Sequence, residues 1–211
     1  MGAIRHGHRL VTSLALAVTL FGATACGSSD GGGIDERRIA APTPKAVVDP
    51  GVYRVPRKIC GAIDFSPLTA VLGEPFKAPG DATQLSNDTG GGAECVQRFG
   101  SIDVLNEAFV GCRAYIDVPR TAELFDYRRG VGVKYAVDGV KDTPHVGQQA
   151  FQYSHKLDMP PWDTELWLTV RDSNLLCELK ARTEDALPSD KAPAAYAALA
   201  EIARTTLPEL R

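Results

Sequence analysis

The segment from Leu10 to Cys26, LVTSLALAVTLFGATAC, constrains this chain most, because it sets the compartment in which the rest of the chain folds. Arg5 and Arg9 precede an apolar run of 12 residues that ends at Phe21, and small residues then lead to the cysteine. This order is typical of a secretory signal that is removed. The run is too short to cross a hydrocarbon core of about 30 Å, which needs roughly 20 apolar residues. We therefore expect an exported domain that folds where disulfides form.

The end of this segment, Ala23-Thr24-Ala25-Cys26, resembles the bacterial lipobox. The resemblance implies that residues 1–25 are a lipoprotein signal peptide and that Cys26 carries a diacylglyceryl group. The mature chain is then lipid-anchored at the extracytoplasmic face of the cell membrane, and two or more acyl chains would hold it stably, at about 0.8 kcal/mol per buried CH₂. An ordinary signal peptide cleaved after Ala25 is the alternative. The glycines and prolines that follow predict a flexible tether over residues 26–57 and a single domain over 58–211.

The charge and length of the mature chain limit its possible partners and the number of its domains. Removing residues 1–25 takes away two arginines and no acid, so 21 basic side chains face 26 acidic ones and the formal net charge of the mature chain is −5. A nucleic-acid partner is not expected, because such proteins carry a basic stripe. The remaining 186 residues suit one domain of ordinary size.

Alternating apolar and polar residues predict the strands, and the clearest are residues 109–118, 165–172 and 175–182, with a further strand over 150–154. Ser173 and Asn174 separate two of these strands and predict a tight hairpin. Helical spacing predicts helices over 66–72, 121–129 and 192–207, while 74–94 lacks any rhythm and is expected to be a surface loop. The result is an α+β domain in which a mainly antiparallel sheet carries helices packed on one face.

The cysteines predict how this domain is stapled. Apart from Cys26 there are four, Cys60, Cys95, Cys112 and Cys177, an even number in an exported chain, and spacing alone allows three connectivities. Cys112 and Cys177 fall on the apolar faces of their strands, which favours a bridge between them and leaves Cys60 to pair with Cys95. The close paired spacing of a zinc site is absent from the sequence, and no metal or other cofactor is predicted.

The order of these features is similar to the envelope lipoproteins of high-GC Gram-positive bacteria grouped as domain of unknown function 3558. The features are a cysteine before a short helix ending in Leu-Gly (60–73), the second cysteine opening a strand, a Gly-x-x-Ala-Phe turn over 147–151, and a C-terminal helix rich in alanine and leucine. The resemblance covers about residues 55–208. It implies a location and a fold, and no activity.

A search for catalytic signatures finds no GxSxG elbow, HExxH motif or P-loop in the sequence. The mature chain contains two histidines, His145 and His155, and no spacing forces either to join an acid in a catalytic or metal site. We therefore predict no catalytic residue and no enzyme.

One segment is unusual enough to be a candidate binding surface. Met159, Trp162 and Trp167 lie in and after a loop stiffened by two prolines, and they are expected either to present an apolar patch or to fold back over the end of the sheet. We predict a non-catalytic binding module for a small apolar ligand or an envelope protein partner. The alternative is an envelope hydrolase with an unrecognised site.

Overall fold

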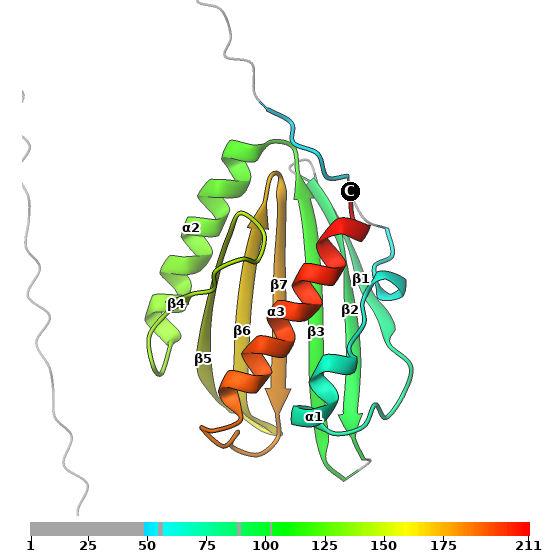
Figure 1. Ribbon diagram of the computed structural model, residues 1–211, viewed down its shortest axis with the longest axis vertical. Helices are drawn as coiled ribbons and strands as arrows, with labels where there is room; N and C mark the ends of the chain where they lie inside the picture. Colours follow the sequence, from blue (N-terminus) through cyan, green and yellow to red (C-terminus); the bar gives the residue numbers. More distant parts are fainter. Residues whose placement is uncertain (1–48, 55–56, 88–89, 102) are drawn as a thin grey trace, which may run out of the picture. The chain divides into compact units, whose positions relative to one another are not determined.

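The structure is a computed structural model that describes residues 49–54, 57–87, 90–101 and 103–211 (Figure 1). The predicted signal peptide, Cys26 and most of the predicted tether lie outside the described residues. The helices are α1 (Thr69–Leu72), α2 (Val118–Tyr135) and α3 (Ala192–Glu209), and two 3₁₀ turns, η1 (Cys60–Ala62) and η2 (Ser66–Leu68), precede α1. The strands are β1 (Gly80–Asn87), β2 (Gly90–Gly100), β3 (Leu105–Tyr115), β4 (Lys141–Asp142), β5 (Gln149–Met159), β6 (Trp162–Asp172) and β7 (Leu175–Thr183).

The strands form one antiparallel sheet in the order β1-β2-β3-β7-β6-β5-β4. In chain order, β1, β2 and β3 form one series and β4, β5, β6 and β7 form another, and α2 connects the two series. Only the pairing of β3 with β7 joins them within the described sheet. The expected α+β fold is confirmed, and so is the hairpin at Ser173-Asn174, where Asp172 pairs with Leu175.

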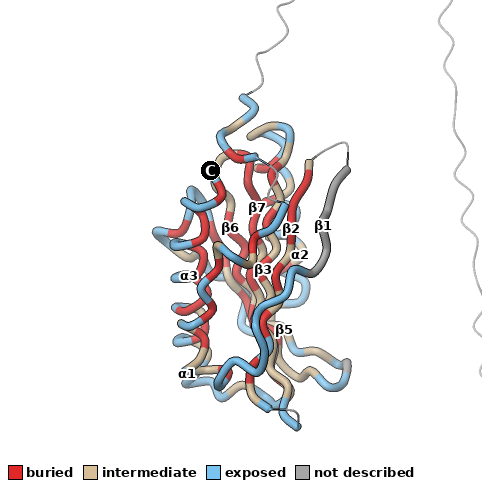
Figure 2. Tube along the Cα trace, turned by 90° about the vertical axis from the view of Figure 1, so that its right-hand side faces the viewer, coloured by how far each residue is buried: buried red, intermediate tan, exposed pale blue. Residues whose placement is uncertain are grey.

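Helix α3 covers one face of the sheet and builds the main core (Figure 1). Its inward stripe includes Leu199, Ile202 and Ala203, which are at most 2 % exposed. Leu168 and Leu179 of the central strands face this stripe and are equally buried. α1 joins the same core, and Figure 2 shows α1 and α3 on the same side of the sheet. Burial of these aliphatic side chains is the main source of stability, at about 25 cal/mol per Å² of apolar surface.

Helix α2 packs on the opposite face, which corrects the expectation that all helices share one face. The ring of Phe125 on α2 meets Phe151 of β5 edge-on, with centroids 5.1 Å apart, and Leu176 of β7 joins this second cluster. Leu176 alternates along β7 with Leu175 and Cys177, which belong to the core under α3. Since neighbouring side chains of a strand point to opposite faces, α2 and α3 lie on different sides of the sheet.

Both predicted disulfides are confirmed. Cys112 and Cys177 are directly opposite each other on β3 and β7, with Cα atoms 4.1 Å apart. Cys60 in η1 is bonded to Cys95 in β2, with Cα atoms 5.2 Å apart. One bridge therefore ties the two strand series together, and the other holds the turns before α1 against the sheet.

The expectation of a surface loop over 74–94 is wrong, because β1 and the beginning of β2 occupy most of this range. Glycine and small polar residues hide the alternation by which strands are recognised in sequence. Gly92 has a structural reason: a Cβ at this position would overlap the backbone of Cys112 and Arg113 on the neighbouring strand. Within the described part of the chain, no helix is both long and apolar enough to span a bilayer.

Candidate functional site

The three predicted binding residues do not form one surface. Met159 and Trp162 are paired at the end of the β5–β6 hairpin, on either side of the cis bond between Pro160 and Pro161. Trp167 lies five positions further along β6, and an odd separation in a strand places it on the other face from Trp162. The proline loop thus lies at one end of the sheet, and Trp167 lies further along β6 on the other face from Trp162.

Trp167 is part of a row of side chains that crosses four strands. The strand register aligns Phe109 (β3), Lys180 (β7), Trp167 (β6) and Tyr153 (β5), which we call the aromatic row. The ammonium nitrogen of Lys180 lies 3.7 Å from the ring centroid of Trp167 and 4.9 Å from that of Phe109, and Tyr153 stacks on Trp167 at 5.6 Å. A cation between two ring faces is attracted by both.

Burial sets the titration of this row. It lowers the pKa of Lys180, an effect that Glu178 and Glu165 partly oppose. Burial also raises the pKa of Tyr153, and the nearby Glu165 and Glu178 raise it further. Both side chains are thus pushed toward their neutral forms.

A row of alternating charges runs beside the aromatic row. The register aligns Arg98 (β2), Glu107 (β3), Arg182 (β7), Glu165 (β6) and His155 (β5), which we call the charged row. Arg182 lies 3.8 Å from Glu107 and donates from Nε to Glu165 at 2.6 Å. The side chain of Glu165 is 3 % exposed and also accepts a hydrogen bond from Trp167 Nε1 at 2.5 Å. The hydrogen bond between Trp167 and Glu165 therefore connects the aromatic row to the charged row.

The predicted histidines lie apart. His155 Nδ1 is 4.0 Å from Glu165, whose carboxylate already accepts from two other donors and so serves to position them. His145 is an exposed residue in the turn before β5, with a φ of 62°. Among the described residues there is no group of three or more histidine, cysteine or acidic side chains placed to hold a metal ion.

Helix α2 covers this face of the sheet over β5, β6 and the part of β7 around Leu176. Arg128 of α2 reaches Glu178 at 2.9 Å, and beyond it β2, β3 and part of β7 remain uncovered by the described elements. Phe109 and Lys180 are half-buried, while the side chain of Arg98 is 53 % exposed. We call this uncovered region the open face. A depression of about 250 Å³ lies within it, beside Gly111 and Phe109.

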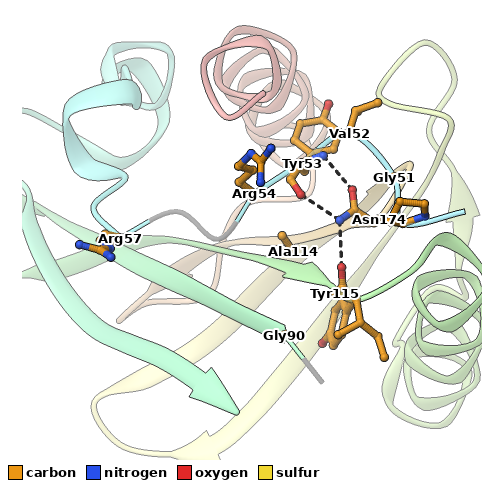
Figure 3. A pocket seen from close by; sticks show the side chains of 11 residues that line it. Gly51, Val52, Tyr53, Arg54, Arg57, Gly90, Ala114, Tyr115 and Asn174 are labelled. Atoms are coloured by element: carbon orange, nitrogen blue, oxygen red, sulfur yellow. Dashed lines mark hydrogen bonds between the residues drawn. The ribbon is translucent and has the colours of Figure 1, made fainter. Parts of the chain in front are cut away.

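A larger depression lies where the described chain begins, and we call it the N-terminal cleft (Figure 3). Its volume is about 600 Å³, and its lining residues are Pro50, Gly51, Val52, Tyr53, Arg54, Arg57, Gly90, Ala114, Tyr115, Ile116 and Asn174. Residues 50–54 and Arg57 form one side of the cleft. The paired strand ends at Gly90 and Tyr115 form the other.

The side chain of Asn174 connects the two sides of the cleft through hydrogen bonds to Tyr53 and Tyr115. It accepts a hydrogen bond from the backbone N–H of Tyr53 at 2.8 Å and donates to the carbonyl oxygens of Tyr53 and Tyr115, both at 2.9 Å. Tyr53 is 4 % exposed, and its hydroxyl donates to Asp172 at 2.5 Å. Burial raises the pKa of Tyr53, and the bond to Asp172 raises it further.

This cleft is not predictable from local patterns, because Pro50 and Pro56 give residues 50–57 the composition of the expected tether. The signal that could have found it is Tyr53, a large aromatic residue between two stretches of linker composition. Packing of Tyr53 against the sheet shows that the folded domain includes residues before position 58.

No protein-family model matches the chain, and no curated protein matches it significantly.

Proposed function

We propose that the chain is a lipid-anchored, extracytoplasmic, non-catalytic binding module whose open face docks an envelope protein partner. Its Cys26 anchor follows from the lipobox-like sequence, and on the same grounds we propose membership of the domain of unknown function 3558 lipoproteins.

The observation that carries the proposal is the aromatic row, which begins with the buried Tyr153 under α2 and ends with the half-buried Lys180 and Phe109 on the open face. Protein interfaces are enriched in aromatic and arginine side chains, and a few of these residues supply most of the binding energy. Phe109, Lys180 and Arg98 offer this combination on a sheet surface. Glu165 holds Arg182 and Trp167 in place beside these residues, so these two side chains lose little conformational entropy on docking.

A photo-crosslinking amino acid at Arg98 tests the proposal in cells of the source organism. We expect one discrete protein adduct, which Lys180→Glu in the same chain abolishes because it reverses the charge between the two rings. The matched control carries the crosslinker at Tyr127, a residue of α2 that is 64 % exposed. No adduct from Arg98, or the same adduct from both positions, would contradict the proposal. Circular dichroism checks that the Lys180→Glu variant is folded.

A further inference from the structure

We infer that the N-terminal cleft binds the anionic headgroup of a phospholipid in the anchoring membrane, so that this end of the domain rests on the bilayer. The cleft is separate from the open face. The inference rests on the proposed function only through the lipid on Cys26.

The position of the cleft supports this inference. Asn174 and Asp172 hold Tyr53, so the segment that begins at Asp49 is fixed to the sheet at this end of the strands. Cys26 precedes Asp49 by 23 positions. Along the chain, the cleft is therefore the part of the domain nearest to the anchor, and the β5–β6 hairpin lies at the other end of the strands.

The apolar part of the cleft suits the interfacial region of a membrane. Val52 and Ile116 line it and are 60 % and 58 % exposed, although both are large aliphatic residues. The transfer of such side chains from water to the boundary between headgroups and acyl chains is favourable. A volume of about 600 Å³ also lies within the range of sites that hold small ligands.

The charge of the cleft selects an anion. Arg54 and Arg57 line it and are exposed, and neither forms an ion pair with any described residue. The nearby carboxylate of Asp172 is already engaged by Tyr53 and by Arg211 at 3.2 Å. Figure 3 shows Arg54 and Arg57 at separate places along the cleft, so that each adds a positive charge there in a chain with a mature net charge of −5, and a guanidinium group binds phosphate through paired hydrogen bonds.

Vesicle sedimentation with the mature chain tests the inference. Cys26→Ser removes the lipid, so that any binding reports the domain itself. We expect binding to vesicles of phosphatidylglycerol and phosphatidylcholine, weakening as salt rises, and little binding to phosphatidylcholine alone. Arg54→Gln with Arg57→Gln should weaken binding roughly 10- to 30-fold, since each cation near an anionic surface strengthens it about fivefold. Ile116→Ser should weaken it as well.

The matched control is Lys134→Gln with Arg204→Gln, which removes the same charge from two exposed helix positions and should leave binding unchanged. Equal losses in the two double variants, or equal binding to neutral vesicles, would overturn the inference. A competition with excess soluble glycerol phosphate gives a further test. If the chain binds this compound tightly but its binding to vesicles is undiminished, the cleft is a site for a free phosphate and the inference is overturned. An unmodified Cys26 in cells would defeat the proposed anchor without affecting these results.

Discussion

Lys180 is a cation placed where two opposing effects act on its charge. Burial disfavours the ammonium form and lowers the pKa, whereas the rings of Trp167 and Phe109 attract the positive charge. In the unfolded chain the side chain keeps its ordinary pKa of 10.5. Between the lowered pKa and 10.5, the unfolded chain therefore binds more protons than the folded chain. The contribution of Lys180 to the free energy of unfolding therefore rises with pH across that window. At pH values below the window, the full destabilising effect of burying the ammonium group remains.

Lys180→Met, which keeps the length and apolar stem of the side chain, isolates this effect. We expect the free energy of unfolding of the wild-type chain to rise relative to that of the variant as the pH approaches 10.5. Urea denaturation of both proteins across this range measures the difference. Subtracting the variant also removes the common loss of stability above pH 10.0, where tyrosines such as Tyr53, whose folded pKa is raised, ionise first in the unfolded chain. A difference that falls with pH would mean that the rings outweigh burial.

At the scale of elements, the pairing of β3 with β7 joins the two strand series, and the Cys112–Cys177 bridge crosses this pairing. Both cysteines are 2 % exposed and belong to the core under α3. The bridge closes a separation of 65 residues, against 35 for Cys60–Cys95. A longer closed loop restricts the unfolded chain more.

Replacing Cys112 and Cys177 together by alanine should lower the free energy of unfolding by about 2 to 5 kcal/mol. The matching double variant of Cys60 and Cys95 should lose about 0.5 kcal/mol less through its shorter loop. Denaturant unfolding of the two variants and the wild type gives both values. A larger loss from the shorter loop would show that local packing of η1, and not loop closure, determines the effect.

For the whole molecule, the proposed lipid on Cys26 decides where the domain acts. Cys26→Ala should move most of the protein from the membrane fraction to the soluble one, because the cleft alone would hold the domain far more weakly than acyl chains worth about 0.8 kcal/mol per buried CH₂. Fractionation followed by immunoblotting measures this shift. Mass spectrometry that finds an unmodified thiol on Cys26 of the mature wild-type protein would contradict the anchor.

Features that depend on local alternation were predictable from the sequence. The hairpin at Ser173-Asn174 and the helix from Ala192 follow from short-range patterns. The bridge between Cys112 and Cys177 was also predictable, since each cysteine lies on the apolar face of its own strand. The side of the sheet covered by α2 was not, because apolar and polar residues mix on that face: Leu176 lies between Asn174 and Glu178, and Phe151 follows Gln149, so no apolar stripe shows.

The sequence by itself determined the strands β3, β5, β6 and β7, the main helices, the fold class and the favoured disulfide pairing, because side-chain periodicity is a property of consecutive residues. Tertiary structure alone decided the two candidate sites. The charged and aromatic rows exist only when strands from distant parts of the chain align, as Phe109 and Lys180 do. The N-terminal cleft depends on hydrogen bonds between Tyr53 and Asn174, which are 121 positions apart. No local pattern encodes such a contact, because each partner alone is an ordinary polar or aromatic residue until the sheet brings them together.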